Sequence, residues 1–147
     1  PLNVKTTTEE LGVDEKIASF VLPLGMTINM NGTSIYMGVT AVFAAEVFGI
    51  DLTLAQQFQI VLMGVLAAVG TAGVPGAGLI MTTLVFTEVG IPLEAVALIA
   101  GIDRILDMIR TSVNVLGDSL TALVVSKSEG VLGTELMDQD TVVKEQL

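Results

Sequence analysis

The stretch Asp103-Arg-Ile-Leu-Asp-Met-Ile-Arg-Thr-Ser-Val-Asn-Val-Leu-Gly-Asp118 decides the fold of this chain. Successive residues of a helix are rotated by about 100°, which brings the strongly polar side chains of the stretch into an arc of roughly 100°. The residues in that arc are Asp103, Asp107, Arg110, Thr111, Asn114 and Asp118. Apolar side chains cover most of the remaining surface, so the sequence predicts a helix with one charged stripe.

The charged stripe needs partners. One ionised side chain at the centre of a bilayer costs about 2.5–3.5 kcal/mol, so the ionised groups of the stripe would together cost about 10 kcal/mol or more if they faced lipid. Ion pairs between Arg110 and Asp107 or Asp103 would neutralise part of this charge. The carboxylates still outnumber the inward-pointing cation, which indicates that the stripe binds a further cation.

The composition is that of a membrane protein. Of the 147 residues, 52% are hydrophobic and 15% are charged, and the mean hydropathy is +0.78. Residues 17–45 and 52–87 contain no charged side chain, and uncharged runs of this length are typical of segments embedded in a lipid bilayer. The sequence therefore predicts an all-α, multi-pass protein of the cell (inner or plasma) membrane.

Residue types that the chain lacks exclude several functions. There is neither cysteine nor histidine, which removes zinc–thiolate sites, thiol catalysis and the usual general base. We therefore expect no enzyme and no cofactor. The net charge is −10, with most of the acidic residues in the tails and loops, and nothing in the sequence indicates nucleic-acid binding. Because the chain starts at Pro1 without a signal pattern, we expect it to be a fragment of a longer protein.

Helix-breaking residues divide the chain into segments. As a single helix, residues 14–48 would be about 52 Å long, whereas the hydrocarbon core of a bilayer is ~30 Å thick. A break at Asn29-Met-Asn-Gly-Thr33 resolves this mismatch, because glycine and asparagine are poor helix formers. The glycines and proline of Gly70-Thr-Ala-Gly-Val-Pro-Gly-Ala-Gly78 break the next apolar unit. From Pro92 to Ser128 we expect one long helix, weakened locally at Gly117.

The second apolar unit fits a re-entrant hairpin with its tip at residues 73–78. Leu79–Val89 would be about 17 Å long as a helix, too short to cross alone. An ordinary two-span hairpin fits the apolarity equally well. The loops between the spans carry only acids, whereas basic residues flank the spans, namely Lys5, Lys16, Lys127 and Lys144. The positive-inside rule then places both ends of the chain in the cytoplasm and favours the re-entrant hairpin.

The predicted organisation has the following order. It comprises a polar lead-in (1–13), a broken transmembrane helix (14–50), a re-entrant helical hairpin (51–91), a substrate- and cation-binding transmembrane helix (92–128) and an acidic cytoplasmic tail (129–147). Interrupted helices beside a charge-striped helix are typical of secondary transporters, where unwound backbone faces cations and substrate. Taken singly, a ligand-free kink and a plain turn explain the interruptions equally well. A passive channel or receptor that uses the stripe as a ligand ring is a further interpretation.

Three motifs resemble the signature segments of the sodium/dicarboxylate symporter family, which includes excitatory amino acid transporters and prokaryotic glutamate–aspartate transporters. The motifs are Asn29–Thr33, Gly70–Gly78 and Asp103–Asp118, in the family's order and spacing over residues 9–129. The resemblance implies part of an elevator-type transport domain, with the hairpin as its gate, in a homotrimer. It also implies secondary active transport of an acidic amino acid, L-aspartate or L-glutamate, coupled to sodium or, as the alternative, to protons.

The resemblance also implies a set of substrate-binding residues. Arg110 would bind the side-chain carboxylate of the substrate, a bidentate task that suits a guanidinium. Asp107 would bind the amino group and Asn114 the α-carboxylate. The full set implied by the resemblance is Thr33, Val74, Gly78, Asp107, Arg110, Thr111 and Asn114.

For cations, the resemblance implies sites built from oxygen atoms, which suit a hard cation such as sodium. One site would use Gly25, Asn29, Asn114 and Asp118. A second would use Thr27, Ala68, Val69 and Thr71. Asn31 departs from the family, which usually has aspartate at this ligand of a third site, so a lower ion count or a proton in place of one ion stays open. The retained Asp118, which proton-coupled relatives often replace, favours sodium.

Overall fold

The computed structural model of the protein describes residues 1–70 and 76–133, and in these ranges the chain forms helices and no β-strand, as the sequence predicts. The elements are α1 (Leu2–Lys5), the π-helix η1 (Thr6–Glu10), α2 (Glu15–Ile28), α3 (Asn31–Val47), α4 (Leu54–Gly70), α5 (Ala77–Val89), α6 (Glu94–Ala100) and α7 (Asp103–Ser128). None of the helices in the described ranges is both long enough and apolar enough to span a membrane.

The chain folds as two compact units. Unit 1 contains residues 1–26 together with the chain from Val115 onward, and unit 2 contains Thr27–Asn114. Helices α2 and α7 each contribute residues to both units. The charged stripe is therefore divided, because Asp103, Asp107 and Arg110 belong to unit 2 whereas Asp118 belongs to unit 1.

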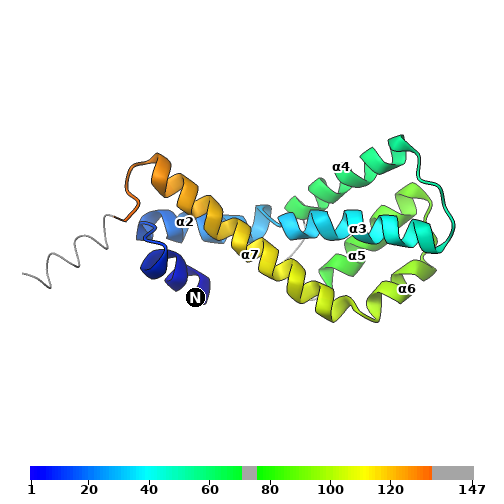
Figure 1. The fold of residues 1–147 in the computed structure, drawn as a ribbon, viewed down its shortest axis with the longest axis horizontal. Coiled ribbons are helices and arrows are strands. Elements are labelled where there is room, and N and C mark those ends of the chain that lie inside the picture. Colours follow the sequence, from blue (N-terminus) through cyan, green and yellow to red (C-terminus); the bar gives the residue numbers. More distant parts are fainter. Residues whose placement is uncertain (71–75, 134–147) are drawn as a thin grey trace, which may run out of the picture. The chain divides into compact units, whose positions relative to one another are not determined.

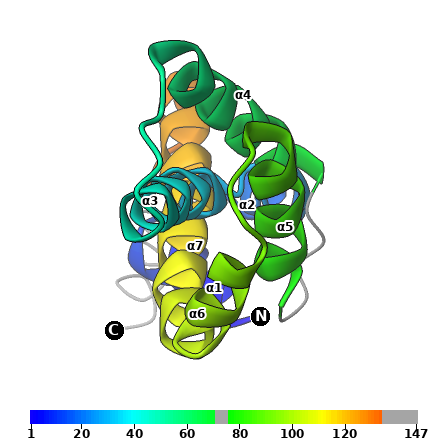
Figure 2. The same cartoon turned by 90° about the vertical axis from the view of Figure 1, so that its right-hand side faces the viewer.

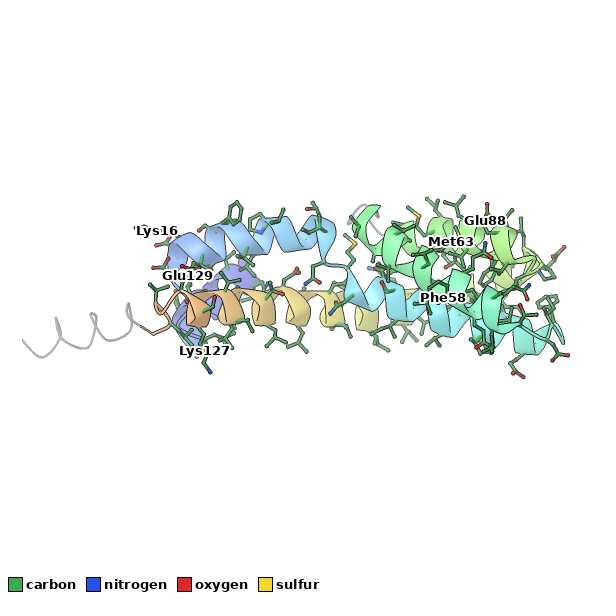
Figure 3. All side chains as sticks on the ribbon, turned by 90° about the horizontal axis from the view of Figure 1, so that it is seen from above. Lys16, Phe58, Met63, Glu88, Lys127 and Glu129 are labelled. Carbon is green, nitrogen blue, oxygen red and sulfur yellow. The ribbon has the colours of Figure 1, made fainter. Side chains whose placement is uncertain are left out.

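Unit 1 has a small core of tightly packed apolar residues. Its buried members are Val13, Ala18, Leu22 and Ala122. The Asp14 carboxylate accepts hydrogen bonds from Lys16 N at 2.9 Å and Ile17 N at 3.3 Å, so it caps α2 at the position where the sequence predicts a helix start. Most of the predicted lead-in is itself helical, as α1 and η1. Figure 3 shows Lys16, Lys127 and Glu129 at one end of this unit.

The first apolar segment is interrupted at Asn29 and Met30, within the range that the sequence predicts. Met30 has φ −93° and ψ 60°, which is not a helical conformation. Helix α3 begins directly afterwards at Asn31, so the interruption is shorter than the predicted five-residue motif. The asparagine and glycine residues here favour a break because their helix propensity is low.

Unit 2 is a bundle in which α3, α4 and α5 pack against one another and α6 packs against α5 (Figures 1 and 2). Helices α4 and α5 lie side by side and run in opposite directions, as the two arms of a helical hairpin (Figure 1). Its predicted tip lies partly outside the described residues, which include only Gly76, Ala77 and Gly78 of it. The largest fully buried side chains of the unit belong to Phe86, Met37 and Ile99.

Glycines in the left-handed conformation end α3 and α5. Gly90 has φ 79°, and Ile91 N donates to Phe86 O at 2.9 Å. Gly49 has φ 64°, and Ile50 N donates to Ala45 O at 2.8 Å. This pattern satisfies carbonyls that the helix leaves open, and a side chain at either glycine would be strained. Backbone hydrogen bonds thereby fix the C-terminal ends of α3 and α5.

The prediction of one continuous helix over 92–128 is wrong. The chain forms α6 and α7, separated by a turn at Gly101 and Ile102, where Figure 1 shows a change of direction. Glycine weakens a helix, and Asp103, an acidic residue in the first turn of α7, is favourable at a helix start. Gly117, in contrast, does not interrupt α7. The predicted tail at 129–147 is described only as far as Gly133.

Replacing Phe86 by alanine is expected to lower the free energy of unfolding by about 3–5 kcal/mol, because the ring is fully buried in the core of unit 2 and its removal leaves a cavity. Thermal or denaturant unfolding of the purified protein measures the change. The matched control is Phe58→Ala on α4, where the side chain is 71% exposed (Figure 3). Equal destabilisation by both variants would contradict the packing described for unit 2.

Candidate functional site

The first half of α7 carries a cluster of charged side chains that is largely withdrawn from solvent. Arg110 is 7% exposed and Asp103 is 8% exposed. The Asp107 side chain is 17% exposed, whereas that of the neighbouring Arg104 is 74% exposed. Burying ionised groups in this way is unfavourable unless they are paired and hydrogen-bonded.

Three groups surround the Arg110 guanidinium. Its Nη2 donates to Asp107 Oδ1, one turn earlier on α7. The Tyr36 ring of α3 lies against it, with the ring centroid 4.9 Å from Cζ. Gly78 of α5 approaches so closely that a Cβ atom there would collide with the guanidinium. Among the residues that the structure describes, the buried Nη1 has no hydrogen-bond partner.

Tyr36 connects Arg110 to a second carboxylate. Its hydroxyl donates to Asp103 Oδ1 at 3.0 Å, and the tyrosine is only 7% exposed. A buried tyrosine hydroxyl normally needs such a partner. Asp103, Tyr36 and Arg110 therefore form a continuous contact chain between α7 and α3.

The start of α3 docks against α7 through its backbone. Gly32 N donates to Asn114 Oδ1 at 2.7 Å and also lies 2.9 Å from Asn31 Oδ1. A Cβ atom at Gly32 would meet Val113 Cβ at 3.1 Å and Asn114 Oδ1 at 3.0 Å, so only glycine fits comfortably. The first turn of a helix has unpaired N–H groups, and one of them here fixes the orientation of the Asn114 amide.

Gly25 and Asp118 meet within unit 1. Asp118 is 3% exposed, and a Cβ atom at Gly25 would collide with its carboxylate. The side chain therefore lies against the backbone of α2. The two other residues predicted for this cation site, Asn29 and Asn114, are both half-buried and belong to unit 2.

The remaining predicted residues differ in exposure. Thr33 is buried at the start of α3, and Ala68 is buried in the last turns of α4. Those that are exposed are Thr27, Asn31, Val69 and Thr111. Thr71 and Val74 lie outside the described residues. Within the described part of the chain, no three acidic side chains gather into a metal-binding group.

Two residues of this arrangement were not predicted as site residues. Tyr36 is the one tyrosine of the chain and follows Thr33 at a spacing of one helical turn, so the face of α3 that carries Thr33 could have identified it. Gly32 gave no comparable signal, because its importance depends on the close approach of α3 to α7. Gly32 lies in the motif Asn29–Thr33 that the sequence marks as a helix break, and Tyr36 lies one helical turn after it.

A cavity of about 180 Å³ adjoins the cluster between α3 and α7. Tyr36 and Arg110 line it together with apolar side chains that include Val39, Leu106 and Ile109. The Arg110 side chain thus has free space on one side and the tight contact with Gly78 on another. The orientation of the Arg110 guanidinium therefore depends on its contacts with Asp107, Tyr36 and Gly78.

Chemically, the cluster suits a ligand that carries charges of both signs. A guanidinium binds a carboxylate through two parallel hydrogen bonds, and the adjacent Asp107 can receive an ammonium group. Such a ligand would supply Arg110 Nη1 with an acceptor and would separate Arg110 from Asp107.

Gly78→Ala is expected to destabilise the protein by about 1–3 kcal/mol, since the added methyl group overpacks the contact with Arg110. In an Arg110→Ala background the same change should cost less than about 0.5 kcal/mol. Unfolding measurements on the four proteins of this double-mutant cycle give the coupling energy. Gly38→Ala in α3, where a Cβ atom meets nothing within 4 Å, is the control. An additive cycle would show that Gly78 does not contact Arg110.

Comparison with known proteins places the chain in a transporter family. The profile of the sodium:dicarboxylate symporter family matches residues 1–128. The chain is 44% identical over 127 residues to a proton/sodium-glutamate symport protein of Bacillus caldotenax. The aligned region covers 86% of this chain and 30% of that protein. It is 46% identical over 125 residues to an excitatory amino acid transporter of Caenorhabditis elegans, with coverages of 85% and 25%.

A human relative gives the same result. The chain is 45% identical over 132 residues to human excitatory amino acid transporter 2, which covers 88% of this chain and 23% of that protein. The chain spans less than a third of the length of these curated relatives. The matched family and the named relatives are transport proteins, not enzymes. Because the family profile matches residues 1–128 of this chain, the chain belongs to the sodium:dicarboxylate symporter family.

Proposed function

We propose that this chain forms the substrate-binding part of a secondary transporter that moves an acidic amino acid together with a cation. The observation that carries the proposal is the buried Arg110 guanidinium, which is paired with Asp107 on one nitrogen and has no partner for Nη1 within the described residues. The names of the relatives, which are glutamate symport proteins and excitatory amino acid transporters, support the same substrate class.

The substrate is aspartate or glutamate. Its side-chain carboxylate binds Arg110, and its amino group takes over Asp107 with the help of Thr111. Asn114, whose Oδ1 is held by Gly32 N, offers its amide nitrogen to the α-carboxylate. Thr33 and the backbone near Val74 and Gly78 complete the pocket. Each charged group of the ligand then meets a group of opposite charge or a hydrogen-bond donor.

Sodium is the coupled ion. The buried carboxylate of Asp118 supplies negative charge beside the backbone of α2, and carbonyls of Gly25, Asn29 and Asn114 add oxygen ligands. A second site uses carbonyls of Thr27, Ala68, Val69 and Thr71. Asn31 accepts a hydrogen bond from Gly32 N and has no charge to offer, which favours a lower ion count than an aspartate would give. Proton coupling is the alternative.

The protein works in the membrane as a homotrimer whose transport domain moves as an elevator, with the hairpin of α4 and α5 as gate. Many large apolar side chains of these helices are exposed, including Phe58, Leu62, Leu66, Ile80 and Leu84. Together with the uncharged runs at 17–45 and 52–87, they favour contact with lipid or with other apolar helices. Both ends of the chain lie in the cytoplasm.

Arg110→Cys in the full-length gene product is expected to reduce aspartate uptake at least tenfold and to raise uptake of neutral amino acids, because the variant loses the partner of the side-chain carboxylate. Cation-driven uptake and counterflow in proteoliposomes measure both effects. Arg104→Cys, which removes a 74% exposed arginine from the same helix, is the control and should leave the preference unchanged. Unchanged aspartate uptake in Arg110→Cys would refute the pocket assignment. Flux without counterflow would favour a passive channel.

Asp118→Asn is expected to raise the sodium concentration for half-maximal uptake at least tenfold, because the amide keeps the shape of the buried side chain and removes its charge. Sodium titrations at two pH values provide the measurement. Glu129→Gln makes the same chemical change on an exposed side chain of unit 1 and serves as the control. Identical sodium titrations of Asp118→Asn and the parent protein would count against sodium at this residue. Uptake driven by a proton gradient alone would support the alternative.

A further inference from the structure

The Tyr36 side chain separates Arg110 from Asp103. Its ring centroid lies 4.9 Å from Arg110 Cζ, and its hydroxyl donates to Asp103 Oδ1 at 3.0 Å. All three side chains are at most 8% exposed. The Tyr36 ring covers one side of the guanidinium, and Asp103 holds the hydroxyl of that ring.

A ring in this position holds a guanidinium by its face. The attraction between a cation and an aromatic face is weak at exposed sites and becomes stronger when both groups are withdrawn from water. The bond from the hydroxyl to an anionic carboxylate shifts electron density toward the ring, because hydrogen bonds in a chain polarise one another. Asp103 thereby strengthens the contact between Tyr36 and Arg110 without touching the guanidinium.

The adjoining cavity makes this contact necessary. Tyr36 and Arg110 both line the space of about 180 Å³ between α3 and α7. Without the ring that space would be larger, and the flexible arginine side chain could turn into it. Gly78 also packs against the guanidinium and leaves no room for even a methyl group. The ring and Gly78 together limit the orientations of the guanidinium, and with them the direction of Nη1, which has no hydrogen-bond partner among the described residues.

We propose that Tyr36 and Asp103 are a positioning pair that fixes the Arg110 guanidinium and thereby sets the discrimination between acidic and neutral amino acids. The inference rests on the proposed function, since it assumes that Arg110 binds a side-chain carboxylate. Bidentate binding needs a fixed guanidinium plane, whereas a neutral side chain makes no use of it. Loss of the pair therefore weakens binding of an acidic amino acid selectively.

The test uses the full-length gene product in proteoliposomes, with L-aspartate as substrate and L-asparagine as its uncharged competitor. Tyr36→Leu is expected to raise the KM for aspartate at least tenfold, to change the maximal rate less than twofold and to leave the inhibition constant of asparagine within twofold. Tyr36→Phe keeps the ring and loses the bond to Asp103, so it should raise the KM for aspartate about two- to fivefold. Asp103→Asn should act in the same direction.

Phe86→Leu is the matched control, because it also replaces a buried ring of the unit 2 core by leucine. It should leave the KM for aspartate within twofold. If Tyr36→Leu does not fold, Tyr36→Phe and Asp103→Asn decide the matter, and an unchanged KM in both overturns the proposal. Equal weakening of aspartate and asparagine overturns it as well. If the unsubstituted protein shows no cation-dependent aspartate uptake, the proposed function fails and this inference fails with it.

Discussion

Burial of the Arg110 guanidinium is the constraint on which the arrangement of unit 2 depends. A cation that is 7% exposed must be compensated from several directions. Asp107 neutralises it, the Tyr36 ring covers it and Gly78 makes room for it. These residues come from α7, α3 and α5, so one side chain fixes the relative positions of three helices. The same burial leaves Nη1 without a partner in the described part of the chain.

Both helix breaks create a new helix start next to a polar side chain of α7. At Asn29 and Met30 the helix stops, and the new first turn of α3 presents Gly32 N to Asn114. At Gly101 and Ile102 a turn separates α6 from α7, so that Asp103 begins a helix instead of lying within one. A helix start has free N–H groups and a partial positive charge, which suits a buried carboxylate such as Asp103. Each of the two helix breaks therefore creates a helix start that stabilises a polar side chain of α7.

Patterns within single helices could be predicted from the sequence, whereas contacts between helices could not. The rotation of a helix places Asp107 and Arg110 on one face, and these residues form an ion pair in the structure. The interruption near Asn29 follows from low helix propensity. The ring of Tyr36 against Arg110 depends on how α3 is rotated against α7, which no local pattern encodes. The break at Gly101 was missed because an isolated glycine is often tolerated in a helix, as Gly117 is in α7.

Charge balance gives a physical reason why substrate and cation should move together under the proposed function. In unit 2, Asp107 forms ion pairs with the buried Arg110 and the exposed Arg104, and Asp103 is a second carboxylate that accepts a hydrogen bond from Tyr36. An acidic amino acid carries one more negative than positive charge, so its binding leaves the stripe with excess negative charge. Asp118, further along the same helix, adds another carboxylate. Binding of a cation there lowers the free energy of binding the anionic substrate, and by reciprocity the substrate raises the affinity for the cation. Coupling then requires no direct contact between the two ligands, because α7 carries the charges that both of them compensate.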